Sequence, residues 1–397
     1  MTKLKKRFSL KTPIGIDKPI QIAVIGLALF GMIMVSSAVM GADAANYRVL
    51  IRNIAKQLVV IVIGLVGMFC TTRFFTFDYA KKKLEILIWG TAFLLVFALS
   101  FRGSNGAHAW IRIVALGIEF TIQPSEFAKI SIIVILAVCL GNKKIENIHA
   151  KDLLKKPLGI LFMYVLIIVV LQSDMGSGVV LFLIAVVLLL IPQHKALHRF
   201  QSYSLVLLTL GLIMLVFLLS PMGETFLQKL PIAQFQINRF LAAINPFQDK
   251  YSHGYQLIRG LTSFASGGMT GVGLGGSIQK YMNFFAAETD YILAIVVEEL
   301  GFLGFLVIFF GYMIIVYRLF NYAFKIQSEK ARMVLVGVAM YLIIHFLFNV
   351  GGVTGLIPLT GVPLLLISEG GSSTISFMMA IGVTQAIIWQ YHQGQIQ

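Results

Sequence analysis

Acidic side chains mark the start of an apolar stretch over residues 290–317. Asp290 begins the stretch, Glu288 lies two residues before it, and Glu298 and Glu299 lie eight and nine residues after it. A charged group at membrane depth is unfavourable in free energy, so each is a functional candidate, with a structural ion pair as the ordinary alternative. A helix N-terminus stabilises an anion. Asp290 is therefore a functional candidate, although an acid at this position is more often structural.

Three further ionisable residues lie earlier in the chain. Glu126 and Lys129 follow Pro124, which suits the start of a helix, and their spacing puts both on one helix face. They are expected to pair inside the membrane or to line a polar cavity. Asp174 lies in the short polar segment 172–177, where it would cap the following helix or face such a cavity.

A connection rich in Gly, Ser and Pro spans residues 358–373. It contains Glu369 but no lysine or arginine, and His345 and Asn349 precede it within an apolar stretch. These residues add polar groups to the same side of the predicted membrane as Asp290.

Apolar helices must position these side chains. The chain has 397 residues, 58% apolar and 12% charged, with a mean hydropathy of +0.87, whereas soluble domains carry about 25% charged residues. A membrane-spanning helix needs about 20 mostly apolar residues. Ten stretches come near that length, at residues 20–40, 57–72, 85–100, 126–141, 157–172, 177–192, 203–220, 290–317, 333–351 and 373–390. We therefore predict an all-α polytopic membrane protein with about ten transmembrane helices.

The positive charge of the chain predicts its orientation. Of the 32 lysines and arginines, 21 fall in the N-terminal segment and alternate connections, whereas 10 fall in the other connections. Because basic residues favour the cytoplasmic side, both termini are predicted to be cytoplasmic. Residues 1–19 form a basic cytoplasmic segment and residues 20–397 a single membrane domain. The net charge of +15 then reflects topology, and no nucleic-acid partner is predicted. The only cysteines, Cys70 and Cys139, lie within apolar runs, so no disulfide framework is expected.

One long extracytoplasmic loop, residues 221–289, is predicted between the seventh and eighth spans. Loops of this length are uncommon unless they are functional. Residues 267–276 are glycine-rich and match a dinucleotide-binding pattern from Gly271, but that motif requires a preceding strand and a βαβ unit. A flexible or tightly turning re-entrant segment near the membrane surface is the favoured interpretation. These patterns alone do not separate an enzyme from a transporter.

The motifs in these places resemble the SEDS family, the FtsW, RodA and SpoVE proteins of bacterial cell-wall synthesis. Their order and spacing match from the first span to the last. The matching motifs are Asn105-Gly106-Ala107 with Trp110, residues 123–129, residues 174–177, Arg239, Asn245-Pro246-Phe247 with Asp249, Gly254-Tyr255-Gln256, residues 267–280, Thr289-Asp290-Tyr291, Glu298-Glu299-Leu300-Gly301, residues 358–363, and Ile367-Ser368 with residues 370–373. Residues 271–280 and 288–290 look more like the division and sporulation branch, FtsW and SpoVE, than like RodA.

The resemblance implies a peptidoglycan glycosyltransferase that polymerises lipid II at the outer face of the bacterial cytoplasmic membrane, with a septal role in cell division. The essential aspartate of the family matches Asp290, which would deprotonate the acceptor hydroxyl in an inverting displacement. Cations would stabilise the departing diphosphate. The implied substrate-binding residues are Arg239, Lys280, Lys129, Glu126, Asp174, Trp110, Gln256 and Ser368. No cofactor or metal site is predicted, although a divalent cation bridging Asp290 and the diphosphate stays open.

The implied partners are lipid II, the nascent glycan strand, a class B penicillin-binding protein acting as transpeptidase, divisome proteins and membrane lipid. Three departures concern the positioning of the acceptor and contacts with partners. Ala109 replaces a usual basic residue, residues 284–287 replace a Leu-Pro-Glu type of turn, and Glu369 follows Ile367-Ser368. A lipid II flippase and a non-enzymatic divisome scaffold are the alternatives. Transporters often have repeated halves with paired broken helices, and no such repeat is evident in this sequence.

Overall fold

The computed structural model describes residues 15–41, 47–101, 103, 107–115, 118–141, 149–229, 234–252 and 254–396. The Asn105-Gly106 part of the first family motif and the basic residues before Gly15 lie outside these ranges. The described elements are α2 (Lys18–Val39), α3 (Tyr47–Phe74), α4 (Phe77–Lys82), α5 (Leu84–Ala98), β1 (Ile111–Ala115), β2 (Ile118–Ile122), α6 (Pro124–Leu140), α7 (Ala150–Leu166), the π-turn η2 (Ile167–Leu171), α8 (Met175–Leu189), η3 (Lys195–Leu197), α9 (His198–Leu218), α10 (Pro221–Leu227), α11 (Gln234–Ile244), α12 (Tyr255–Gly267), η4 (Gln279–Tyr281), α13 (Ile292–Lys325), α14 (Glu329–Val353) and α15 (Gly371–His392).

Each of the ten predicted apolar stretches coincides with a helix: α2, α3, α5 to α9 and α13 to α15. Within the described ranges, seven helices are long and apolar enough to cross a membrane, and α5 and α8 are shorter apolar helices. The polytopic helical class is confirmed, whereas the count of ten crossings stays a prediction. The helix α3 begins ten residues before the predicted span of 57–72, so Lys56 lies on this helix and not in a loop.

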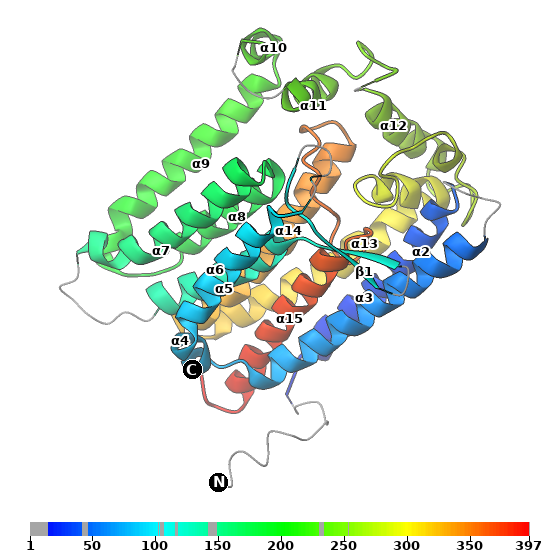
Figure 1. The fold of residues 1–397 in the computed structure, drawn as a ribbon. Helices are drawn as coiled ribbons and strands as arrows, with labels where there is room; N and C mark the ends of the chain where they lie inside the picture. The colour runs from blue at the N-terminus through cyan, green and yellow to red at the C-terminus, as the bar shows by residue number, and fades with distance from the viewer. Residues whose placement is uncertain are drawn as a thin grey trace.

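The helices α6, α8, α14 and α15 form the centre of the bundle and have the largest buried shares of residues. The helix α15 packs along α3, α13 packs against α2 and α14, and α6 contacts α5, α8, α14 and α15. The helix α9 stands at the edge of the bundle, and only 6% of its apolar window is buried (Figure 1).

The first described residues and the C-terminal end of the chain lie at the same end of the bundle. Asp17 caps α2 by accepting a hydrogen bond from the Ile20 amide at 3.0 Å, as expected for an N-cap carboxylate. Its other oxygen accepts from Arg318 Nε on α13 at 2.8 Å, and its backbone amide donates to Gln385 on α15. The connections that carry α10, α11 and α12 lie at the opposite end (Figure 1).

A short antiparallel hairpin, β1 with β2, lies between α5 and α6 and is absent from the all-α prediction. Arg112 pairs with Thr121 and Ile113 pairs with Phe120. The alternation of polar with apolar or β-branched residues is the pattern of a strand, but each run has only five residues. The hairpin places Arg112 beside the outer ends of α3 and α15.

The glycine-rich segment 267–276 packs against a break in α13. Gly301 has φ of +67° within that helix, and a Cβ there would lie 2.3 Å from the backbone of Met269. The amides of Val272 and Phe302 donate to the carbonyls of Glu298 and Gly268. The glycines therefore serve close approach of two backbones, in agreement with a tight turn. No strand precedes this segment in the described part of the long loop, so the dinucleotide motif is excluded there.

Candidate active site

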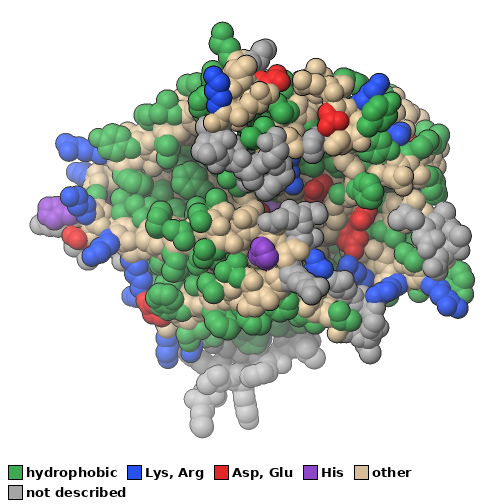
Figure 2. Space-filling view, turned by 45° about the horizontal axis from the view of Figure 1, so that its top comes forward, with side chains coloured by type: hydrophobic (Ala, Val, Ile, Leu, Met, Phe, Trp, Pro, Cys, Tyr) green, Lys and Arg blue, Asp and Glu red, His purple; other side chains and the backbone are tan. Residues whose placement is uncertain are grey.

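Two adjoining cavities open at the end of the bundle opposite the termini. The first, called the polar cavity, has a volume of about 300 Å³ and a larger polar share of its wall than the second; its lining includes Trp110, Gln123, Asp174, Arg239, Thr289, Asp290, Thr360, Glu369, Ser372 and Ser373. The second has a volume of about 630 Å³ and a largely apolar wall; its lining includes Lys56, Val60, Ile63, Arg112, Phe120, Phe127 and Ile375. Trp110, Thr289, Glu369 and Ser372 line both. The face turned forward in Figure 2 is hollowed near its centre, where acidic and basic side chains lie among apolar ones.

A tight turn presents Asp290 to the polar cavity just before α13 begins. The carbonyl of Ala286 accepts the amides of Thr289 at 3.2 Å and Tyr291 at 3.0 Å. Ala286 has φ of +58°, a left-handed conformation that an alanine rarely adopts. Asn349 donates from Nδ2 to the carbonyls of Asp290 at 2.9 Å and Val362 at 3.1 Å. Asn349 thereby fixes the backbone of Asp290 to the segment 360–363 that forms another wall of the cavity.

Burial and neighbouring charges set the protonation of Asp290. Partial burial raises its pKa from 3.8 to about 6, with Arg239 acting to lower that pKa and Glu288 acting to raise it. Arg239 comes from α11 and lines the same cavity. A carboxylate with a pKa near neutral is suited to accept a proton during a reaction. Of the predicted site residues, Asp290, Arg239, Asp174 and Trp110 are brought together here.

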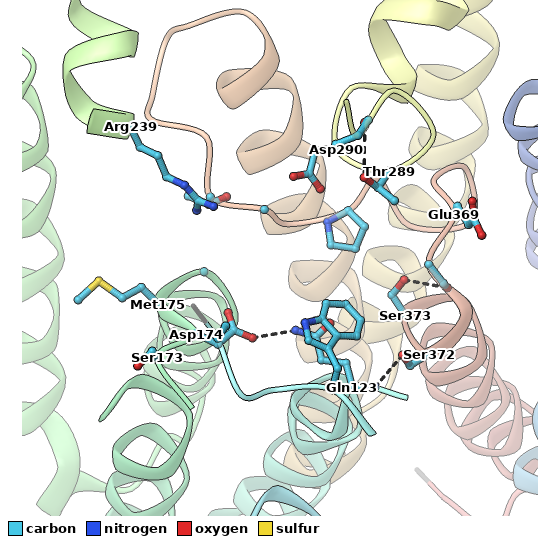
Figure 3. Close-up of a pocket in the computed structure, with 18 residues that line it drawn as sticks. Gln123, Ser173, Asp174, Met175, Arg239, Thr289, Asp290, Glu369, Ser372 and Ser373 are labelled. Atoms are coloured by element: carbon cyan, nitrogen blue, oxygen red, sulfur yellow. Dashed lines mark hydrogen bonds between the residues drawn. The ribbon is translucent and has the colours of Figure 1, made fainter. Parts of the chain in front are cut away.

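The opposite wall of the polar cavity is a hydrogen-bonded set around Asp174. Its Oδ1 caps α8 by accepting the Ser177 amide at 3.0 Å, and its Oδ2 accepts from Gln123 Nε2 at 2.7 Å. The backbone amide of Gln123 donates to Ser372 Oγ at 2.9 Å. Figure 3 shows Arg239 and Asp290 on one side of the pocket, with Asp174 and Gln123 on the other. Asp174 therefore both caps a helix and faces the cavity.

Glu126 and Lys129 lie buried beneath the cavity and do not line it. Lys129 Nζ donates to Glu126 Oε1 at 2.6 Å and contacts His345 Nε2 at 3.0 Å, while the other ring nitrogen of His345 lies 3.0 Å from the carbonyl of Pro363. The Tyr341 hydroxyl donates to Glu126 Oε2 at 2.6 Å. The predicted salt bridge is present and is linked through His345 to a cavity wall. A direct contact of either residue with a substrate stays a prediction.

Lys280 lies in a different buried cluster, apart from both cavities. Its Nζ donates to Glu299 Oε1 at 2.8 Å, Ser37 Oγ at 3.1 Å and the carbonyl of Gly275 at 2.9 Å. An ammonium has three N–H groups, so all of its donors are satisfied within the protein. The paired side chains of Lys280 and Glu299 are 0% exposed. This geometry gives Lys280 a structural contact within the protein, and the contact with a diphosphate that the resemblance implies stays a prediction.

Glu298, Gln256 and Ser368 hold segments around the site. The carboxylate of Glu298 accepts from Ser277 Oγ at 2.6 Å and from the Ile278 amide at 3.0 Å, which fixes the end of the glycine-rich segment. With its amide oriented to satisfy both groups, Gln256 donates to the carbonyl of Phe285 at 2.6 Å and accepts the amide of the same residue. Ser368 Oγ accepts the Leu364 amide at 2.9 Å. A substrate contact of Gln256 or Ser368 stays a prediction.

Several residues of the site were not singled out from the sequence. Thr289 and Gln123 lie within family motifs and line the polar cavity, although neither was predicted as a site residue. Lys56 is one of the ten basic residues counted for orientation, and Glu369 is named as an acid in a connection without lysine or arginine and as a departure from the family motif. Their pairing at 2.8 Å joins residues 313 positions apart. A charge beside an apolar run was the available signal for Lys56, and an acid in a polar connection was the signal for Glu369, but neither signal indicates that the two residues pair.

In the described ranges, no group of three or more His, Cys, Asp or Glu side chains is arranged to hold a metal ion. A divalent cation shared between Asp290 and a bound diphosphate stays an open expectation.

Comparison with known proteins decides the family. A family model described as "Cell cycle protein", FtsW/RodA/SpoVE, matches residues 18–393. The chain belongs to the FtsW/RodA/SpoVE family. The match spans every described helix and both cavities, so the SEDS membership expected from the motifs is confirmed.

Two relatives of this FtsW/RodA/SpoVE protein are similar over most of their length. It is 32% identical to stage V sporulation protein E of Bacillus subtilis, over 90% of this chain and 92% of the relative. It is 30% identical to a protein of Trichlorobacter lovleyi named "Probable peptidoglycan glycosyltransferase FtsW", over 92% of this chain and 91% of the relative. Names of the FtsW and SpoVE branch are thus among the relatives.

Solved structures of the family share the fold. A chain from a peptidoglycan synthase complex, described for its coordination of polymerization and crosslinking, superposes with a TM-score of 0.72 at 23% identity, covering 96% of this chain and 99% of that one. The rod shape determining protein RodA of Thermus thermophilus gives a TM-score of 0.61 at 22% identity, covering 95% and 98%.

Proposed function

We propose that this FtsW/RodA/SpoVE protein is a peptidoglycan glycosyltransferase that polymerises lipid II at the outer face of the cytoplasmic membrane. One observation carries the proposal: a carboxylate with a raised pKa, Asp290, faces Arg239 in a polar cavity that adjoins a larger apolar one. The names of its FtsW relatives support the reaction class. A substrate with a sugar at one end and a long lipid at the other fits this arrangement of two cavities.

The proposed reaction is a single displacement at the anomeric carbon of the donor. Asp290 accepts the proton of the acceptor hydroxyl as the acceptor oxygen attacks that carbon. The bond from the anomeric carbon to the diphosphate breaks, and the diphosphate leaves on its lipid with the electron pair of that bond. Arg239 is placed to stabilise negative charge in the same cavity. A single displacement inverts the anomeric configuration, so an α-linked donor gives a β-linked product.

The apolar cavity is suited to the lipid of the donor. It lies between α3, the β1–β2 hairpin, α6 and α15, and its apolar lining includes Val60, Ile63, Phe120 and Ile375. Burial of a lipid tail against such a wall contributes about 25 cal/mol per Å² of apolar surface. The sugars then extend into the polar cavity towards Asp290, which orients the donor for attack.

A class B transpeptidase is the proposed partner. The complex that shares the fold was described for coordinating polymerization with crosslinking, which supports a partner of that class. Divisome proteins and a septal location are further proposals, supported by the FtsW names of the relatives.

Purified protein in lipid nanodiscs, with and without its transpeptidase, should convert lipid II into glycan polymer that a muramidase digests. The same preparation in vesicles should move no lipid II across the membrane. Translocation without polymer under either partner condition would support a flippase and contradict the proposal. If the protein makes no polymer and moves no lipid II but still binds its partner, the result would support a scaffold.

The pH dependence of the reaction should report the pKa of Asp290. Because the base acts in its ionised form and its pKa is about 6, kcat/KM should fall below pH 6 and level off above it. Glu288 raises this pKa, so Glu288→Gln should move the falling limb to lower pH. Arg239 lowers it, so Arg239→Gln should move the limb to higher pH. Limbs that stay in place in both variants would show that another group is the base.

Filling the apolar cavity should weaken binding of the lipid. Ile63 is 47% exposed and lines this cavity on α3, so a larger side chain can be added without overpacking the core. Ile63→Trp should raise KM for a donor with a full-length lipid about threefold to tenfold, from the loss of buried apolar contact. A donor with a short lipid should be little affected, and kcat should stay near the parent value. An equal change in KM for both donors would show that the lipid binds outside this cavity.

A further inference from the structure

An ion pair lies where the two cavities meet. Lys56 Nζ on α3 contacts Glu369 Oε1 at 2.8 Å, and Asn53 Nδ2 lies 3.4 Å from the other oxygen. Glu369 lines both cavities and Lys56 lines the apolar one. The two side chains are 25% and 15% exposed. This pair is therefore reachable from the space that a ligand would occupy.

The other ion pairs near the site differ from this one. Glu126 with Lys129 and Lys280 with Glu299 are at most 1% exposed, and further hydrogen bonds hold each of them. Breaking such a pair leaves an uncompensated buried charge. A partly solvated pair exchanges partners at a far smaller loss of free energy. Of these three pairs, Lys56 with Glu369 is the one suited to open and re-form.

The acidic side chains at this pair, Glu369 and Glu288, disfavour the binding of an additional anion. Arg112 and Glu288 line the same apolar cavity as Lys56 and Glu369. Burial raises the pKa of Glu288, the negative charge of Glu369 raises it further, and Lys56 lowers it. The Glu369 backbone is fixed, since its amide donates to the Glu288 carbonyl at 2.8 Å, but the long side chain can rotate. An anion that binds to Lys56 here takes the place of the Glu369 carboxylate.

We propose that Glu369 is a displaceable counterion, which neutralises Lys56 in the empty site and gives way to the diphosphate of the incoming lipid-linked donor. This inference rests on the proposed function. A donor with its lipid in the apolar cavity and its sugars in the polar one has its diphosphate at their junction, beside Lys56. The diphosphate carries more negative charge than one carboxylate, so it competes well for the ammonium. Glu369 thereby keeps a cationic site neutral between turnovers and lowers its affinity for the lipid diphosphate product.

The test measures binding without turnover. Undecaprenyl diphosphate, which carries no sugar, is titrated into nanodiscs that hold the full chain. Glu369→Gln removes the competing charge and should tighten binding about threefold to fivefold, the range expected for a partly exposed pair. Lys56→Met should weaken binding about tenfold, and the double variant should bind like Lys56→Met because the effect of Glu369 acts through Lys56. Glu85→Gln, from the exposed pair of Glu85 with Lys156, is the matched control and should leave binding unchanged.

Weaker or unchanged binding in Glu369→Gln would overturn the proposal, as would tighter binding that persists in the double variant. Failure of the proposed function is seen separately. If the wild type makes no polymer but the variants bind the probe as expected, the glycosyltransferase assignment fails and the counterion stands. If polymer forms and Glu369→Gln binds the probe no more tightly, the counterion alone fails.

Discussion

Replacing Asp290 with asparagine is expected to lower glycan polymerisation by at least about a thousandfold, because the amide cannot accept the proton of the acceptor hydroxyl. The two side chains have nearly the same shape, and the backbone of Asp290 is held independently by Asn349 and the turn at Ala286. The variant should therefore fold, bind lipid II and bind the transpeptidase. Polymer length and yield, measured on purified protein, check the loss.

Two controls sharpen this prediction. Asp290→Glu keeps an ionisable base but shifts its oxygens, so it should retain more activity than asparagine and still show a falling limb at low pH. Asp174→Asn changes another carboxylate of the same cavity, whose two oxygens already accept hydrogen bonds from Ser177 and Gln123. This variant should lose less activity than Asp290→Asn. Polymerisation by Asp290→Asn within tenfold of the wild type would rule out Asp290 as the base.

Removing the charge of Lys280 is expected to destabilise the protein by about 3–5 kcal/mol, the loss typical of one partner of a buried ion pair. In Lys280→Met, the carboxylate of Glu299 would stay buried and lose the ammonium, while keeping the hydrogen bonds from the Ser37 hydroxyl. The segment that ends at Lys280 packs on the break at Gly301, so its loosening should lower the thermal unfolding temperature. Lys156→Met removes a lysine from an exposed pair and should leave that temperature unchanged within error.

The double variant Lys280→Met with Glu299→Gln separates a structural role from a substrate contact. The glutamine is neutral and can still bond to Ser37, so much of the stability should return. If Lys280 is structural, polymerisation should return with stability. Restored stability with activity still absent would mean that Lys280 contacts the diphosphate after all, as the family motif implies.

The order of the apolar helices and the position of Asp290 could be read from the sequence. Hydropathy over about 20 residues is a local property, so the ten apolar helices α2, α3, α5 to α9 and α13 to α15 follow from composition. An acid before a long apolar helix is also a local signal, and the motifs around it raised Asp290 to the catalytic candidate. The long loop was identified, but its helices α10 to α12 and the hairpin were not, since short amphipathic runs carry weak signals.

Which distant charges meet was decided by the tertiary structure, whereas the pair of Glu126 with Lys129 follows from their spacing within one helix. The motifs made Lys280 and Lys129 equal candidates with Arg239 for the diphosphate, yet only Arg239 lines the cavity of Asp290, while the lysines end in buried pairs with Glu299 and Glu126. The partnership of Lys56 with Glu369 spans 313 positions. Helix formation depends on neighbouring residues, whereas the partner of a side chain depends on how distant helices pack, and a sequence pattern holds no record of that distance.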